Sequence, residues 1–154
     1  MNERSALSLV FVALLGFAYP AYCANPQGAK DIDKRVAVLI KRMLNAKTEQ
    51  KAFSDLEALG CPAVPAIIRL MDDRRVLPDP RISLSNKSPQ AFEAVRHYGP
   101  VQVVDALAAI LNQLTGQDFG FIYNGGTDEE RTRTVQGWNK FLDTAQVAEL
   151  CGAG

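Results

Sequence analysis

The sequence predicts an all-α fold, a short α-solenoid of stacked helix pairs followed by a C-terminal capping helix. Three observations lead to this prediction. Apolar residues recur at helical spacing along most of the chain, two segments match each other without a gap, and an amphipathic segment containing Trp138 follows them. We expect a single helical domain over residues 31–154, preceded by a flexible lead-in at 24–30.

Residues 1–23 have the three parts of a secretory signal peptide. Arg4 supplies positive charge, an apolar run covers 6–18, and small residues precede a cleavage point near Cys23-Ala24. The run is shorter than the roughly 20 apolar residues that span a bilayer. We therefore expect a periplasmic or secreted protein without stable membrane insertion after cleavage. The alternatives are an uncleaved anchor and a lipoprotein acylated at Cys23, which the bulky Tyr22 before it disfavours.

The charges of the chain balance, with 17 Lys and Arg against 17 Asp and Glu. Removal of the signal takes away Glu3 and Arg4, so the balance stays at zero. A basic stripe of the kind that binds phosphate backbones is missing from the sequence. These features exclude nucleic acid as an expected partner and favour another protein outside the cytoplasm.

Two cysteines, Cys61 and Cys151, remain after cleavage. In an oxidising compartment a lone pair of cysteines more often forms a disulfide than a metal or catalytic site. Such a bridge would tie the end of the chain to the helical array and stabilise it by about 4–5 kcal/mol. The alternative is two unrelated thiols.

Three helices are predicted between residues 31 and 71. Thr48 is a candidate N-cap for the second helix, Gly60 ends that helix, and Pro62 stands where the first turn of the third tolerates proline. The expected core positions are Ile32, Val36, Leu39, Ile40 and Met43 in the first helix, Ala52, Phe53, Leu56 and Leu59 in the second, and Val64, Ile67, Ile68 and Met71 in the third.

Residues 72–88 interrupt this pattern with Pro78, Pro80 and mixed charges, which indicates an exposed loop. A helix is expected to restart at Ser88-Pro89, with Phe92 and Val95 on its apolar face, and to stop before Gly99-Pro100. A long helix then follows, with Val104, Leu107, Ala108, Leu111 and Leu114 on one face.

The repeat appears when residues 52–71 are laid on residues 91–110. Phe53 then falls on Phe92, Gly60 on Gly99, and Ile68 on Leu107. A structural repeat must share apolar core positions and helix-ending glycines. We therefore expect two helix pairs, at about 48–73 and 88–114.

The segment Ala-Leu-Gly-Cys-Pro-Ala-Val-Pro-Ala-Ile-Ile-Arg-Leu at 58–70 resembles the turn and second helix of HEAT-like repeats. The second unit departs from that pattern, with Val104 in place of the internal proline. The resemblance covers roughly residues 48–114 and implies stacked helix pairs whose faces bind other proteins. Leu114-Thr115-Gly116, followed by Trp138, is similar to the ending of bacterial secreted and periplasmic HEAT-like proteins.

Residues 115–145 are expected to cap the array. Phe119, Phe121 and Tyr123 alternate in a Gly-rich connector, as in a short extended segment. Thr127–Glu130 then has the form of a capping box, and the helix it opens carries Val135, Trp138, Phe141 and Leu142 on one face. These aromatic residues are predicted mainly to cover the apolar end of the array. The alternative is that they line a binding surface.

The sequence presents no catalytic constellation and predicts no metal or cofactor. His97 is the only histidine, and we place it near the end of a helix. One histidine and two cysteines do not complete a four-ligand zinc site. The carboxylates at 72–73 and 128–130 are read as a solvated cluster and a helix start.

Together these features predict an exported, non-catalytic protein-binding module, such as an inhibitor or immunity protein that blocks a secreted envelope-targeting enzyme. The alternative is an enzyme or a binder of a small acidic ligand that uses the 72–88 loop and the 116–126 connector. That alternative requires the arginines of the loop to converge with Tyr123 on one pocket. The residues expected at a partner surface are Arg74, Arg75, Arg81, Phe119, Phe121 and Tyr123.

Overall fold

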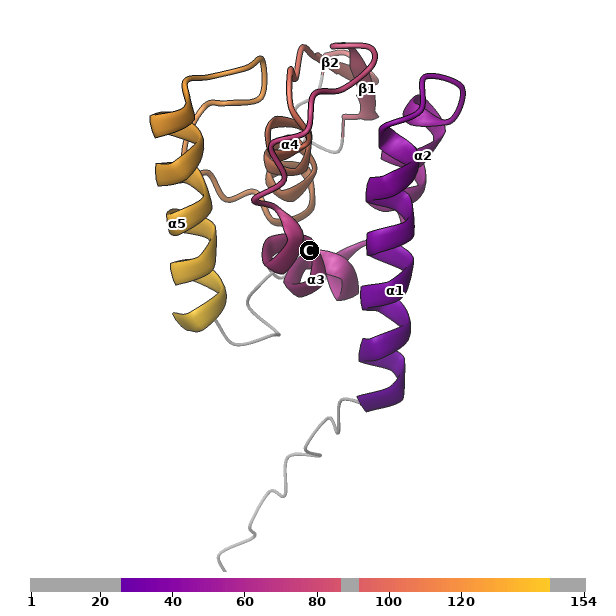
Figure 1. The fold of residues 1–154 in the computed structure, drawn as a ribbon, viewed down its shortest axis with the longest axis vertical. Coiled ribbons are helices and arrows are strands. Elements are labelled where there is room, and N and C mark those ends of the chain that lie inside the picture. The colour runs from indigo at the N-terminus through magenta and orange to yellow at the C-terminus, as the bar shows by residue number, and fades with distance from the viewer. Residues whose placement is uncertain (1–25, 87–91, 145–154) are drawn as a thin grey trace, which may run out of the picture.

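The computed structural model describes residues 26–86 and 92–144 (Figure 1). This part of the chain is mostly helical, as predicted, and it also contains a small two-stranded sheet. The elements are α1 Pro26–Met43, α2 Glu49–Ala58, the 3₁₀ turn η1 Cys61–Ala63, α3 Val64–Leu70, β1 Ile82–Ser85, β2 Val95–Tyr98, α4 Val103–Thr115 and α5 Asp128–Thr144.

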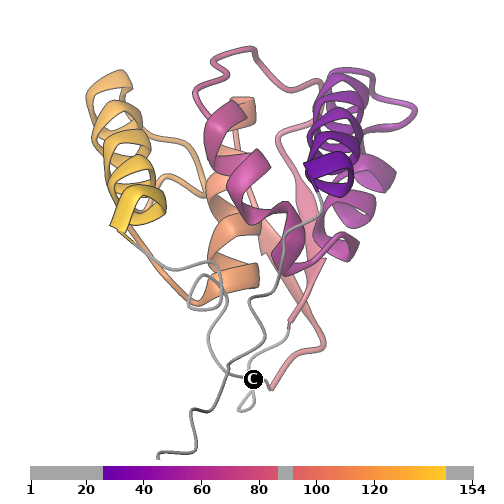
Figure 2. The ribbon, with the colours of Figure 1, turned by 90° about the horizontal axis from the view of Figure 1, so that it is seen from below.

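The helices lie in three groups side by side (Figures 1 and 2). The pair α1 and α2 packs on the central helices α3 and α4, and α5 covers the opposite side of α3 and α4. The hairpin of β1 and β2 packs against α2. The final helix therefore caps the central pair.

The first three helices carry the predicted core. Val36, Phe53 and Ile67, one from each helix, are fully buried. Gly60 follows α2 with a positive φ of 66°, which favours glycine. The lead-in prediction for residues 24–30 is wrong from Pro26 onward, because α1 already begins there. Proline fits this position because the first turn of a helix needs no N–H donor.

Thr48 precedes α2 as predicted, but its side chain does not cap that helix. Its hydroxyl instead donates a hydrogen bond to the carbonyl of Arg42 at 2.8 Å, across the turn that joins α1 to α2. Thr48 therefore stabilises the turn rather than the end of α2.

The second predicted helix pair is incomplete, because residues 95–98 form a strand and not a helix. β2 pairs with β1 in an antiparallel hairpin whose register places Ile82 opposite Tyr98. Phe92, which the repeat aligns with buried Phe53, is fully exposed. The physical reason is local: Ile82 and Leu84 are buried and alternate with serines, which gives this segment a strand pattern and a partner for β2.

The described part of the predicted 72–88 loop, residues 72–86, is more ordered than expected. Leu77 is buried, and its backbone N–H donates to the carbonyl of Val101 at 3.0 Å. The N–H of Val103 donates in turn to the carbonyl of Arg75 at 3.0 Å. These bonds hold the segment against the start of α4.

The prediction for the C-terminal helices is confirmed. α5 opens with the predicted capping box: the N–H of Glu130 donates to the Thr127 hydroxyl at 3.2 Å, and the Glu130 carboxylate accepts from the Thr127 N–H at 2.7 Å. Trp138 is buried and packs edge-on against Phe119, with ring centroids 4.8 Å apart. Phe119 thus packs between the connector and α5.

Among the described residues, no helix is long and apolar enough to cross a bilayer. The predicted signal peptide, residues 1–23, lies outside the described residues.

Candidate protein-binding surface

The connector between α4 and α5 places the three predicted aromatic side chains differently. Phe119 is directed into the interface with α5 and packs on Trp138 and Phe141. Tyr123 is half-buried, and Phe121 is 85 % exposed. The connector therefore directs Phe119 toward α5 and Phe121 to the surface, although alternate positions of a regular strand would share one face.

Buried neighbours hold Phe121 in this exposed position. Ile122 is buried, and the tight turn after it is closed by a 2.9 Å hydrogen bond from the N–H of Gly125 to the Ile122 carbonyl. On the other side, the N–H of Gly120 donates to Asp118 at 2.8 Å. Phe121 is thus fixed between two constrained turns, so its exposure is a property of the fold.

Gly120 itself is required by close packing. Its φ is 147°, and a Cβ built at this position would lie 2.3 Å from the hydroxyl oxygen of Thr134 on α5. Only glycine lets the connector approach α5 this closely.

Phe121 and Tyr123 belong to a cluster that also contains Tyr98 at the end of β2. The Tyr98 and Tyr123 ring centroids are 5.9 Å apart and those of Phe121 and Tyr123 are 6.2 Å apart, both in edge-on arrangements. Gln113 of α4 donates to the Tyr98 hydroxyl oxygen at 3.0 Å and fixes that ring. The hairpin and the connector therefore meet through aromatic contacts.

These rings form one side of a surface cavity of about 550 Å³, which we call the aromatic cleft. Aromatic, acidic and basic side chains all line this cleft. The lining residues are Glu93, Arg96, His97, Tyr98, Asn112, Asp118, Phe121 and Tyr123.

Tyr123 stays neutral in this cleft. Burial, together with the nearby Asp118 carboxylate, raises the pKa of its hydroxyl far above the ordinary value. The hydroxyl oxygen is buried. The ring therefore offers an uncharged wall to anything that enters the cleft.

Each of the three predicted arginines forms an ion pair with the aspartate two positions earlier in the chain. Nε of Arg74 lies 2.6 Å from Asp72, and Nε of Arg81 lies 3.0 Å from Asp79. Arg75 binds Asp73 in the same way. The hydrogen bond from Arg81 lowers the pKa of Asp79 below its ordinary value.

The arginines also lie apart from the aromatic cleft. Arg74 reaches α5, where it donates to the Thr132 hydroxyl at 3.3 Å. Arg81 lines a neighbouring cavity of about 510 Å³, which shares His97 and Tyr98 with the aromatic cleft but does not include Tyr123. Since Tyr123 lines the aromatic cleft, these side chains do not converge as the acidic-ligand alternative requires.

Glu49 links the 72–88 segment to α2. Its carboxylate is only 3 % exposed and accepts a hydrogen bond from the N–H of Asp79 at 3.0 Å. Burial raises the pKa of Glu49, and the second carboxylate oxygen has no partner in the part of the chain described. Gln50 makes two further bonds to the backbone of Ser83.

Several residues of the cleft were missed by the sequence prediction. Arg96 and Tyr98 lie on β2, where a helix was expected. His97 is likewise on this strand and not at a helix end; its Nδ1 lies 2.9 Å from the Ser83 hydroxyl on β1. The period-two pattern of Ile82 and Leu84 was the signal that could have revealed the hairpin.

Cys61 is disulfide-bonded. Cys151 lies outside the described residues, so its pairing with Cys61 stays a prediction. Within residues 26–86 and 92–144, no group of three or more His, Cys, Asp and Glu side chains is arranged to hold a metal ion.

Comparison with protein-family models, with curated proteins and with solved structures finds no match to this chain.

Proposed function

We propose that this chain is an exported protein-binding module and that the aromatic cleft is its partner surface. The observation that carries the proposal is Phe121, which is 85 % exposed although its backbone is held by buried Ile122 and two tight turns. An exposed ring on a backbone held by two turns offers a partner large apolar area with little further ordering of the chain.

The composition of the cleft supports the same conclusion. Tyrosine, phenylalanine and arginine are enriched at protein interfaces and frequent among the residues that dominate binding energy. The cleft contains Tyr98, Phe121, Tyr123 and Arg96. A partner that inserts an apolar side chain beside Phe121 would bury these rings together.

The biological role that suits a small exported binder is inhibition, as in an inhibitor or immunity protein that blocks an envelope-targeting enzyme. Export rests on the sequence of residues 1–23. The relation to HEAT-like repeats is likewise a proposal, and it is strongest for residues 58–71, which form η1, α3 and their flanking turns.

Affinity capture from periplasmic and extracellular fractions tests this proposal. The baits are the mature wild-type chain, Phe121→Ser and Phe92→Ser. Phe92 is a matched control because it is a fully exposed phenylalanine that does not line the cleft. We expect a saturable partner on the wild type and on Phe92→Ser, and its loss on Phe121→Ser. Equal recovery on all three baits would contradict the proposal.

A further inference from the structure

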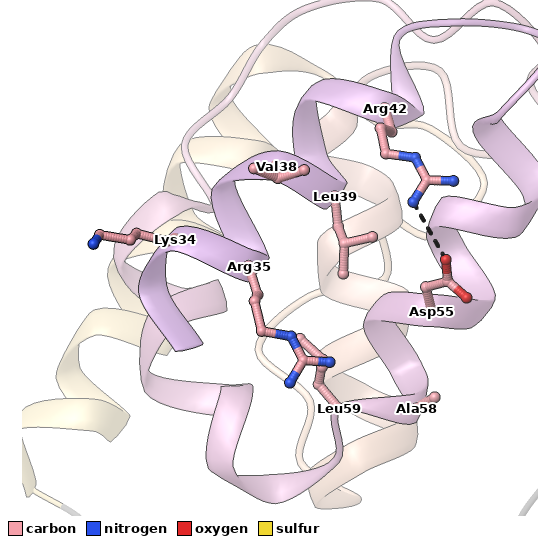
Figure 3. A pocket seen from close by; sticks show the side chains of 8 residues that line it. All are labelled: Lys34, Arg35, Val38, Leu39, Arg42, Asp55, Ala58 and Leu59. Carbon is pink, nitrogen blue, oxygen red and sulfur yellow. Dashed lines mark hydrogen bonds and ion pairs between the residues drawn. The ribbon is translucent and has the colours of Figure 1, made fainter. Parts of the chain in front are cut away.

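A second hollow lies between α1 and α2, and we call it the α1/α2 groove (Figure 3). Its volume is about 560 Å³. It is lined by Lys34, Arg35, Val38, Leu39 and Arg42 of α1 and by Asp55, Ala58 and Leu59 of α2. None of these residues lines the aromatic cleft.

The groove lies on the side of the helix pair that faces away from the core. Val36 of α1 and Phe53 of α2, which face the core, are fully buried. Val38, in contrast, is 58 % exposed. α1 and α2 form one of the two outer helix groups, with α5 on the other side of α3 and α4 (Figure 2).

Along α1, the groove has an apolar centre between two basic ends. Lys34 and Arg35 come one turn before Val38 and Leu39, and Arg42 comes one turn after them. At 1.5 Å per residue, the basic ends are about 12 Å apart along the helix axis. Of the two ends, only the one with Lys34 and Arg35 lacks an acidic residue in the lining, because Asp55 lies beside Arg42.

The charge of the groove is positive although the whole chain is neutral. Asp55 is the single acidic residue of the lining, and it is held by Lys51 at 2.6 Å and by Arg42 at 3.5 Å. Lys34 and Arg35 have no ion-pair partner among the described residues. The unbalanced charges therefore lie at the end of the groove where α1 carries Lys34 and Arg35.

We propose that the α1/α2 groove binds an acidic amphipathic helix of a partner protein. A carboxylate of the helix would meet Lys34 and Arg35, and apolar residues about one turn away from it would cover exposed Val38. The charge complementarity argues for this occupant over a second copy of the chain or a basic segment. The proposal goes beyond the proposed function and does not rest on the aromatic cleft.

A display library of helical peptides tests the proposal on the mature chain. The peptides carry a central leucine, and the flanking positions one turn away on either side are randomised over Asp, Glu, Lys and Ser. We expect selection of Asp and Glu at the flanking position that faces Lys34 and Arg35, and no such preference at the position that faces the Arg42–Asp55 ion pair. The selected peptide, labelled and titrated in solution, should bind saturably and more weakly at higher salt.

Charge-reversed variants make the test specific. Lys34→Glu combined with Arg35→Glu should weaken the selected peptide at least about tenfold and shift selection toward lysine at the flank that faces this end. Lys41→Glu is the matched control, because Lys41 is exposed on the same helix and does not line the groove. It should leave the affinity unchanged, as should Phe121→Ser, which tests the aromatic cleft separately.

Three results would overturn the proposal: selection without acidic preference, equal weakening by Lys41→Glu, or a groove covered by a second copy of the chain. Sedimentation of the wild type over a range of concentrations detects that last case. Circular dichroism of each variant shows whether a loss of binding is a loss of fold.

Discussion

Arg131 of α5 holds Asp105 of α4 in a buried, two-point ion pair. Nε of Arg131 lies 2.7 Å from Oδ1 of Asp105, and Nη2 lies 2.9 Å from Oδ2. The same Oδ2 accepts the backbone N–H groups of Val101 and Gln102, each at 3.0 Å. One carboxylate therefore caps α4 and holds α5 against it. The positions of these two helices fix the two ends of the connector that carries Phe121.

Removing either partner of this pair should destabilise the protein strongly. Arg131→Met leaves the Asp105 charge buried without its counterion, and Asp105→Ala leaves the buried Arg131 with only the exposed Asp128 carboxylate at 3.3 Å. We expect each change to lower the free energy of unfolding by about 3–5 kcal/mol in urea titrations. The variant with both changes should lose less unfolding free energy than the sum of the losses in the two single variants.

The Glu129 and Arg133 pair provides the control for this prediction. Its atoms lie 3.3 Å apart on the exposed face of α5. Arg133→Ala should cost less than about 1 kcal/mol, because water solvates both charges. Similar losses at Arg131 and Arg133 would show that burial does not set the strength of the Asp105 contact.

Gly137 should resist substitution although it lies inside a helix. Gly137→Ala on its own would favour helix formation by about 1 kcal/mol. A Cβ at this position, however, would lie 2.6 Å from Cβ of Phe119, so the capping ring must move. We expect a net destabilisation of about 1–3 kcal/mol, measured by chemical unfolding. A stabilised Gly137→Ala variant would mean that Phe119 does not pack against α5 in solution.

Glu49 should make the stability depend on pH. Because burial raises its pKa in the folded state, the folded protein binds the proton more tightly than the unfolded chain does. The contribution of Glu49 to stability is therefore present below the ordinary glutamate pKa of about 4.3 and is lost as the pH rises through the folded pKa.

Glu49→Gln removes this titration. The unfolding free energy of the variant, relative to that of the wild type, should increase as the pH rises from about 4. Urea titrations of both proteins across the acidic range measure this difference. A difference that stays constant, or that decreases with pH, would be inconsistent with a buried Glu49 carboxylate.

The predicted Cys61–Cys151 bridge can be tested by peptide mapping of the exported protein without reduction. We expect one linked pair of peptides containing these two cysteines and no thiol that reacts in the native state. Reduction should lower the melting temperature, with a loss of about 4–5 kcal/mol in the chain-entropy model. A link from Cys61 to another residue, or two free thiols, would refute this pairing.

The elements predictable from sequence were those specified by local signals. α5 has a capping box and an apolar face within one segment, so its start at Asp128 follows from neighbouring residues. α3 and α4 were recognisable in the same way. The Asp105–Arg131 pair was not, because the two residues are 26 positions apart and each alone looks like an ordinary charge on a helix.

The hairpin shows why the repeat prediction failed in part. Phe92 and Phe53 are the same residue type at equivalent positions of the alignment, yet one is fully exposed and the other fully buried. Burial is decided by what packs against a side chain, and β2 pairs with β1 instead of packing as a helix. The aromatic cleft depends on this hairpin, so Tyr98 and Arg96 could not be placed beside Phe121 from helical periodicity.

Titration of the captured partner against wild type and Phe121→Ala tests the central claim most directly. Removing an interface anchor typically costs at least about 2 kcal/mol. We predict saturable binding to the wild type and an affinity at least about thirtyfold weaker for Phe121→Ala, with the same melting temperature because this ring is exposed. Equal affinities for the two proteins would contradict the assignment of the aromatic cleft as the partner surface.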